Sequence, residues 1–395
     1  MTKVSCRAQA PQKRGTALAT TVGGEGSPTL HIAERHQAYR SYSYLRAGVD
    51  YQDFTLCAEI NRVPPYQTAS LSDEQQAQVD RLLTDSLVIS LHDHPSVMPE
   101  DVTMAGWKWT DVIADVIADV GMRLCDIAHQ DYVVLATSVQ GIKDAHASGR
   151  LALVAGLETS TMIENELDRI DVLYGFGVRE MGIAYSESNS LGSGLRDAHA
   201  SGRLALGRAA VERMNRLGMA IDISHSGDQT CLDVVSASRV AVFITHAGSR
   251  TVWNSNRMKP DEVIVACAER GGVIGLEAAP HTNLSAAHPR HSLELVMDHF
   301  THLVDLIGID HVAFGPDTMF GDHVGLHNMF TAAMSIDAAH TEQEFPKVEY
   351  VDGLENRADC FHNIIGWLVE HAYSDDDIRK VVGENIARVL NEVWI

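Results

Sequence analysis

Four histidines and two acidic residues occur in one order along this 395-residue chain, each at or just after the end of a short apolar run. They are His92, His94, Glu158, His225, His246 and Asp317. The preceding runs, such as LVISL, ALVAGL and VAVFIT, are typical of β-strands. Imidazoles and carboxylates at the carboxyl ends of successive strands are how a (β/α)₈ barrel builds a metal site. The pattern therefore predicts a metal centre in the mouth of a barrel.

The first two histidines form a His-x-His pair at the end of LVISL. Residues i and i+2 of a strand point to the same face, so His92 and His94 can reach one ion while Asp93 points away. An isolated pair of this kind could equally be two polar residues at a strand end. The four candidates downstream favour metal ligands.

Glu158 ends a strongly apolar run, where a lone carboxylate would be costly to bury. A carboxylate can bridge two cations, which suits a binuclear centre. His225 and His246 end consecutive strands and could share a second ion. Taken singly, Glu158 would be an ordinary strand-end residue and each histidine a core residue, so the interpretation rests on the set.

Two further residues suggest roles in catalysis and binding. Asp317 follows VAFGP, where it could contact the first ion, accept a proton from metal-activated water and pass it to a leaving group. The alternative is a turn aspartate. Arg257, in NSNRMKPDE, could clamp a substrate carboxylate. The alternative is a surface arginine that pairs with Asp261 or Glu262.

Apolar runs alternate with amphipathic segments from residue 86 onward, which predicts parallel βα units and an α/β fold. Strands are predicted over 86–91, 151–157, 178–184, 218–224, 241–246, 272–277 and 311–315. Helices are predicted over 162–174, 206–217, 229–237, 260–270, 291–307, 355–371 and 375–381. An eighth strand is expected within 100–145, although DVIADVIADVG and DYVVLATSVQGI are more typical of helices. A further helix should begin near Ser72 or Ser70, ahead of Glu74.

These elements predict two parts: a (β/α)₈ barrel over 71–395 and a tyrosine-rich N-terminal extension over 1–70 that packs on the barrel or on a partner subunit of a homodimer. The decapeptide DAHASGRLAL occurs at 144–153 and again at 197–206, which is too short for a structural repeat. Its histidines, His146 and His199, are poor ligand candidates. His323 and His327 follow Asp317 and could line the pocket.

Composition excludes several classes of partner. The net charge of −22 argues against nucleic acid or an anionic membrane surface. The six cysteines are scattered without a Cys-x-x-Cys pair, which favours reduced thiols and a cytoplasmic protein. We expect no signal peptide, membrane-spanning helix or lipid anchor, because no segment has the required apolar pattern.

The longest motifs are RAAVERMNRLGMAIDISHSG and VFITHAGSRTVWNSNRMKPDEVI, followed by FGPD, DGLEN and VVGENIARVL. With these motifs the chain resembles, over about 85–395, the renal or membrane dipeptidase family (peptidase family M19) of the amidohydrolase superfamily. The resemblance implies a (β/α)₈ barrel with a binuclear zinc centre. It implies that Glu158 bridges the ions and that Arg257 holds the substrate carboxylate. The remaining ligands would divide into His92, His94 and Asp317 on one ion and His225 and His246 on the other.

This chain departs from the family pattern at two positions. The family usually has His-x-Asp where this chain has His92 and His94, so a neutral ligand replaces an anionic one. The family also has a histidine where GVREMGIAYSESN places Tyr185. A tyrosine hydroxyl can donate to an oxyanion, but it cannot carry a proton near neutral pH as imidazole can. Tyr185 either supports catalysis and substrate binding with a changed substrate range, or only fills space.

The sequence therefore predicts a metal-dependent hydrolase with two divalent ions, zinc first and manganese, cobalt or iron as alternatives. A metal-bridging hydroxide would attack the amide of a dipeptide or N-acyl amino acid, a small molecule that carries a carboxylate. Glu158, Asp317 and Tyr185 would serve catalysis. The alternatives are hydrolysis of a non-peptide amide, lactone or carbamate, natural-product tailoring without net hydrolysis, and a non-enzymatic scaffold stabilised by metal.

Overall fold

The structure is a computed structural model that describes residues 49, 64–66, 71–94, 113–197, 204–280, 282–318, 350–355 and 357–395. Almost all of the predicted extension over 1–70 lies outside these residues, as do His199, His323 and His327. No helix of the described part is both long and apolar enough to cross a membrane.

All the strands of the described part pair in parallel. They are β1 (Val133–Leu135), β2 (Leu151–Leu153), β3 (Ala155–Leu157), β4 (Val178–Gly182), β5 (Ala220–Asp222), β6 (Phe243–Ala247), β7 (Val273–Leu276) and β8 (Val312–Phe314). Six of them form one sheet in the order β3-β4-β5-β6-β7-β8, and β1 pairs with β2 in a second sheet. Because consecutive strands are neighbours and parallel, their carboxyl ends gather at one edge.

The segment predicted as a strand over 86–91 is extended beside β8 without forming a regular ladder. The Leu91 N–H donates to the carbonyl of Phe314 in β8 at 2.9 Å, whereas the Ile89 N–H donates to Val382 at 2.8 Å. Because its hydrogen bonds are divided between two elements, this segment has no assigned strand. It still delivers His92 to the end of β8.

Two other strand predictions differ from the structure in detail. The run predicted over 151–157 is two short strands, β2 and β3, separated at Val154. The eighth strand expected within 100–145 is β1. The segment DYVVLATSVQGI is more typical of a helix, and this interpretation is wrong for the three residues of β1, Val133–Leu135. The side chain of Gln130 explains the local structure, because it accepts from the Val133 N–H at 2.6 Å and donates to the Val133 carbonyl at 2.8 Å.

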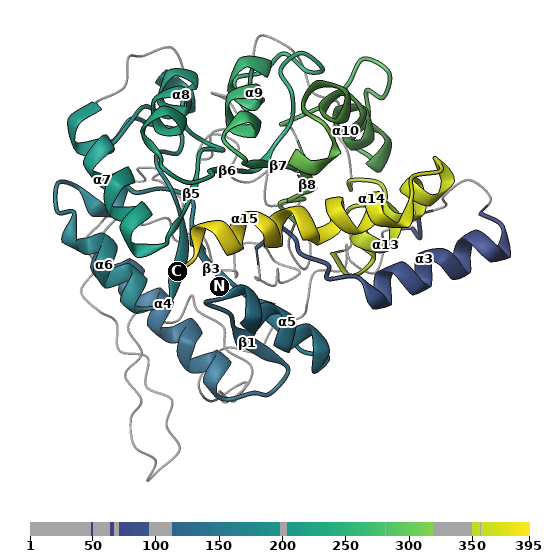
Figure 1. The fold of residues 1–395 in the computed structure, drawn as a ribbon, viewed down its shortest axis with the longest axis horizontal. Coiled ribbons are helices and arrows are strands. Elements are labelled where there is room, and N and C mark those ends of the chain that lie inside the picture. The colour runs from purple at the N-terminus through teal and green to yellow at the C-terminus, as the bar shows by residue number, and fades with distance from the viewer. Residues whose placement is uncertain are drawn as a thin grey trace.

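Helices follow most strands and lie around the outside of the sheet (Figure 1). They are α3 (Asp73–Asp85), α4 (Ile113–Ala128), α5 (Val139–Ala147), α6 (Asp168–Gly175), α7 (Leu204–Leu217), α8 (Asp228–Ala237), α9 (Asp261–Glu269), α10 (Leu293–Ile307), α13 (Arg357–Glu370), α14 (Asp375–Arg379) and α15 (Asn385–Val393). Helix α3 begins after Ser72, as predicted, and Gln75 completes its capping box.

Helix α15 covers the amino ends of the strands. Figure 1 shows it (yellow) lying across the middle of the molecule. Its apolar face shares a core cluster with residues of β6, β7 and β8, namely Phe243, Val273 and Ala313. The side chains that it buries there are Ile386, Val389, Leu390 and Val393. Each contributes about 1.5–3 kcal/mol on full burial, so α15 closes this end and leaves chemistry to the opposite, carboxyl end.

A glycine near the carboxyl end of β8 permits close contact between strands. A Cβ atom built on Gly315 would lie 2.1 Å from the carbonyl oxygen of Thr245 in β6. No other residue fits without moving one of the two backbones. This packing sets the position of the following turn, which carries Asp317.

Candidate metal centre

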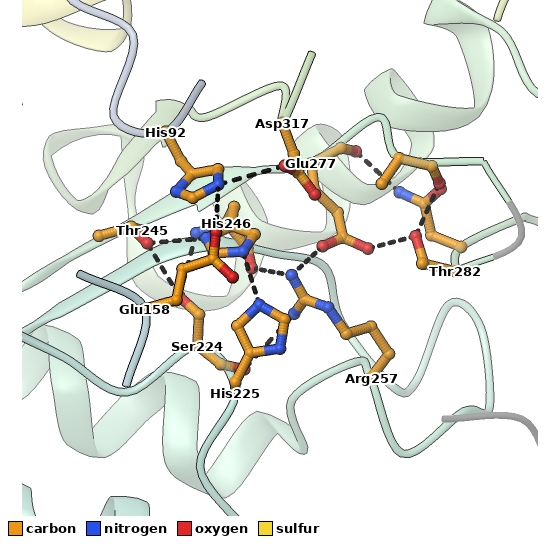
Figure 2. Close-up of polar contacts among 12 residues, drawn as sticks. His92, Glu158, Ser224, His225, Thr245, His246, Arg257, Glu277, Thr282 and Asp317 are labelled. Carbon is orange, nitrogen blue, oxygen red and sulfur yellow. Dashed lines mark hydrogen bonds and ion pairs between the residues drawn. The ribbon is translucent and has the colours of Figure 1, made fainter. Parts of the chain in front are cut away.

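The structure brings all six predicted ligands to the carboxyl ends of the strands. Figure 2 shows five of them: His92, Glu158, His225, His246 and Asp317. His92 and His94 follow the extended segment beside β8, and Glu158 directly follows β3. His246 lies within β6. His225 and Asp317 lie in the turns that follow β5 and β8.

The first two histidines face the two acidic residues, as the His-x-His spacing predicts. His92 Nε2 lies 3.2 Å from Asp317 Oδ1 and 3.4 Å from Glu158 Oε1. His94 Nε2 lies 2.9 Å from Asp317 Oδ1 and 3.8 Å from Glu158 Oε1. Two imidazoles and two carboxylates therefore converge on one small volume. The two histidines come from one segment, and each carboxylate comes from a different one.

The turn that carries Asp317 is tied to the His-x-His segment. Asp317 has a φ of 59°, a left-handed conformation that aspartate tolerates better than most residues, and its N–H donates to the His92 carbonyl at 3.0 Å. Asp93 points away from the centre, as predicted, and its carboxylate accepts from the Thr318 N–H at 3.0 Å and from the Thr318 hydroxyl at 2.8 Å. These bonds hold the Asp317 carboxylate opposite the imidazoles.

The remaining histidines extend this cluster. The ring of His246 stacks on His92 at a centroid distance of 3.6 Å, and its Nε2 lies 2.8 Å from His225 Nε2. The ring of Tyr185 stacks on His225 at 4.1 Å. Burial holds the pKa of His225 well below the usual range, and the charge of Arg257 lowers it further. Burial also holds the pKa of His246 well below the usual range, and His92 and Arg257 lower it further. Both imidazoles are therefore neutral at pH 7, the form that binds metals.

Asp317 and His94 shift each other's pKa in the same cluster. Burial alone would raise the pKa of Asp317, but His92 and His94 hold it well below its ordinary value. Burial alone would lower the pKa of His94, but the hydrogen bond and charge of Asp317 raise it. Asp317 is therefore ionised at neutral pH and can serve as a ligand or a proton acceptor.

A buried carboxylate that the sequence did not identify, Asp222, orients His246. It accepts from the Ser224 N–H at 3.1 Å, from the Ser224 hydroxyl at 2.5 Å and from the Thr245 N–H at 2.9 Å. The hydroxyl of Thr245 in turn lies 2.8 Å from His246 Nδ1. Such partners fix the ring of a ligand histidine and direct its other nitrogen towards the metal.

The substitution Asp222→Asn should lower the free energy of unfolding by about 1.5–3 kcal/mol, because three donors lose a charged acceptor. Denaturant unfolding measures this change. The control is Asp168→Asn, whose side chain is 90% exposed and pairs with Arg213; it should cost less than about 1 kcal/mol. Equal losses in the two variants would contradict a structural role for Asp222.

Arg257 is buried beside the histidines, so its alternative interpretation as a surface arginine is wrong. Its side chain is 2% exposed, and its guanidinium pairs with Glu277 and donates to the His246 carbonyl at 2.7 Å.

Sequence reasoning missed Glu277, although GGVIGLE ends in the same way as ALVAGLE, the run that identified Glu158. Burial raises the pKa of Glu277 to about 7, against the opposing effect of the Arg257 charge.

Lys259 is a second buried cation that the sequence did not reveal. It is fully buried, its Nζ donates to the Ser226 carbonyl at 2.5 Å, and it lies 3.6 Å from Cys231 Sγ. Burial lowers the pKa of Lys259. The lysine anchors the turn that carries His225 and so supports the cluster from behind.

The donor set of this cluster fits divalent metal. Two groups have ligand atoms that all lie within 4.8 Å of one another: His92 with His94 and Glu158, and His92 with His246 and Asp317. Imidazole and carboxylate donors, with no thiolate among them, suit zinc, manganese, cobalt or iron. The residues present therefore match the predicted chemistry of a metal site.

Parallel strands, outer helices and candidate histidine and carboxylate ligands at the strand ends are the features of the metal-dependent barrel class. An amidohydrolase from Pseudomonas aeruginosa has this fold, with a TM-score of 0.66 and 21% identity over 80% of this chain and 99% of that chain. A metallo peptidase from Rhodobacter sphaeroides, solved with a phosphinate mimic of the dipeptide L-Ala-D-Ala, matches with a TM-score of 0.60 and 21% identity over 79% of this chain and 80% of that chain. The predicted fold class is confirmed.

The family model described as membrane dipeptidase (peptidase family M19) matches residues 115–332, more than half of the chain. The chain belongs to this family, which confirms the resemblance. Among curated relatives, dipeptidase tcpJ of Claviceps purpurea is 25% identical over 278 residues, 70% of this chain and 58% of the relative. Dipeptidase verJ of Clonostachys rogersoniana is 28% identical over 280 residues, 69% of this chain and 64% of the relative. The chain thus spans less than two thirds of either relative.

Proposed function

We propose that this protein is a metal-dependent hydrolase that cleaves the amide bond of a dipeptide or a related N-acyl compound. The convergence of His92, His94, Glu158 and Asp317 at the strand ends carries the proposal. Two kinds of relatives support it. The curated relatives are named dipeptidases, and a solved neighbour is a metallo peptidase bound to a dipeptide mimic.

The proposed centre holds two divalent ions, with zinc as the first choice. Glu158 would bridge them, His92, His94 and Asp317 would hold one, and His225 and His246 would hold the other. When bound, the ions supply Lewis acidity, which polarises the scissile carbonyl and acidifies water at neutral pH. The neutral state of His225 and His246 and the ionised state of Asp317 support these roles.

Side chains of the protein supply the remaining chemistry in this proposal. Asp317 accepts the proton of the attacking water and passes it to the amine that leaves. The Tyr185 hydroxyl donates to the oxyanion that forms at the carbonyl. Arg257 lies behind His246 and borders the part of the substrate remote from the scissile bond.

A panel assay of the purified protein, reconstituted separately with zinc, manganese and cobalt, tests the proposal. Dipeptides and N-acyl amino acids should gain one water, which mass spectrometry detects.

A second candidate, hydrolysis of a neutral amide, lactone or carbamate, is favoured by the pairing of Arg257 with Glu277. Turnover of those compounds with none of the dipeptides would select it, and a product of unchanged mass would show that the protein rearranges its substrate instead.

The substitution Tyr185→Phe should lower kcat about 10²-fold, because it removes one donor to the oxyanion. The phenyl ring retains the stacking on His225, so metal content and thermal stability should stay unchanged. Steady-state kinetics on the best substrate of the panel measures the effect. Full activity of the variant would show that the tyrosine only fills space.

We also propose that the protein works in a reducing compartment such as the cytoplasm. The thiols of Cys125, Cys231 and Cys267 are free, and the last two are buried. Free buried thiols are typical of proteins from reducing compartments, whereas small secreted domains tend to be rich in disulfides.

A further inference from the structure

Arg257 and Glu277 form an ion pair that is closed to solvent beside the metal cluster. Their side chains are 2% and 0% exposed, and Arg257 Nη2 contacts Glu277 Oε2. The other carboxylate oxygen, Oε1, accepts from the Thr282 hydroxyl at 2.5 Å. Both oxygens of Glu277 therefore have partners within the protein, as a buried carboxylate requires.

The guanidinium of Arg257 is committed to acceptors of the protein itself. Besides Glu277, it donates to the His246 carbonyl at 2.7 Å and to the Ser224 carbonyl at 3.4 Å. Figure 2 shows the guanidinium between His225, His246 and Glu277. Because Ser224, His246 and Glu277 stand at the ends of β5, β6 and β7, the pair also ties together three strand ends.

The charge balance of this pair bears on the substrate. The pKa of Glu277 is about 7, so above that pH its carboxylate is an anion, and the charges of Arg257 and Glu277 sum to zero in a buried setting. A carboxylate brought against Arg257 would meet the Glu277 charge within the same contact, and like charges at short range in a low dielectric repel strongly. An uncharged group in the same place would meet no such repulsion.

We infer that Glu277 is a specificity-determining residue: by neutralising Arg257, it makes the site prefer substrates whose group facing this arginine is uncharged, such as an amide, an ester or a ring, over those with a free carboxylate. The inference rests on the proposed amide hydrolysis and names its substrate class. It differs from the expectation, based on family resemblance, that Arg257 holds a substrate carboxylate.

A matched pair of substrates tests the inference on the metal-reconstituted protein above pH 7, where Glu277 is ionised. Alanyl-alanine carries a free carboxylate, and alanyl-alanine amide differs from it only by an uncharged group. The wild-type protein should have the higher kcat/KM for the amide, measured by release of alanine amide. In Glu277→Gln the ratio of kcat/KM values should shift towards the free acid by about tenfold or more, equivalent to about 1.4 kcal/mol, because the variant removes the negative charge that repels the substrate carboxylate.

Two further variants separate charge from other effects. Glu269→Gln makes the same change at an exposed residue that ends α9 and should leave the ratio unchanged. If Glu277 acts through Arg257, the shift should disappear when Glu277→Gln is made in an Arg257→Met background. Metal content and melting temperature, measured for each variant, identify one that has lost its fold. If Glu277→Gln has lost its fold, the preference of the wild-type protein between the two compounds decides the test.

The outcomes distinguish this inference from the proposed function. Hydrolysis with an unchanged ratio in Glu277→Gln, or a wild-type preference for the free acid, would overturn the inference alone. If neither compound is hydrolysed, the proposed dipeptide hydrolysis fails, and the same two compounds serve as stable ligands in calorimetric titrations. There the same preference and the same shift are expected, and absence of binding to both proteins would overturn the inference as well.

Discussion

Replacing Asp317 with asparagine is expected to lower kcat about 10²- to 10⁴-fold, the range for loss of a general acid–base group. Asparagine has the same shape but cannot accept the proton of the attacking water. The effect should be large because Asp317 is held ionised and contacts both His92 and His94, at 3.2 and 2.9 Å. Steady-state kinetics under saturating metal is the measurement.

Metal analysis of the Asp317→Asn protein separates loss of proton transfer from loss of a ligand. A full metal content with low kcat would assign the effect to proton transfer, whereas a reduced content would assign it to metal binding. The control is Asp376→Asn, at a side chain that is 90% exposed on α14 and should leave kcat unchanged. Unchanged turnover in Asp317→Asn would favour the scaffold alternative, in which the metal only stabilises the fold.

Removal of metal is expected to have the second large effect. The proposed centre predicts about two metal equivalents per chain by elemental analysis, with two ions bridged by one carboxylate. Because ligand binding stabilises the folded state, a chelator should lower the free energy of unfolding by about 4 kcal/mol when the metal had been present at 1,000 times its Kd. Thermal denaturation before and after chelation and dialysis measures the change.

The substitution Glu158→Gln should reproduce much of this effect without a chelator. Glu158 is buried, and its carboxylate lies 3.4 Å from His92, so the variant should retain fewer metal equivalents and melt at a lower temperature. Glu166→Gln, at an exposed residue of a neighbouring turn, is the matched control. A freshly purified protein that holds no transition metal and does not respond to a chelator would contradict the proposed centre.

The candidate ligands could be predicted from the sequence because two simple geometries locate them. The two-residue period of a strand places His92 and His94 on one side, and parallel neighbours bring strand ends together. The structure bears out both expectations, since the two imidazoles face the same carboxylate oxygens. Glu277 also stands at the end of a strand, but the sequence does not identify it as part of the site. Its partner, Arg257, lies in a loop whose position cannot be predicted from the sequence.

Other features depend on contacts that local sequence does not encode. The three residues of β1 are too few to show a strand period, and their strand state depends on pairing with β2 and on the side chain of Gln130. The segment before His92 was predicted as a regular strand, but it divides its hydrogen bonds between β8 and Val382. Burial of Lys259 likewise follows from tertiary packing around the Ser226 carbonyl.

The position of α15 has a consequence for how the chain reaches its native state. This helix follows every strand in the sequence, yet its apolar face covers the amino ends of β6, β7 and β8. During synthesis the strands leave the ribosome before the helix, so Phe243 and Val273 face water until α15 arrives. During co-translational folding an apolar surface would therefore be exposed for a time at that end. We expect nascent chains that still lack the helix to bind chaperones through this surface.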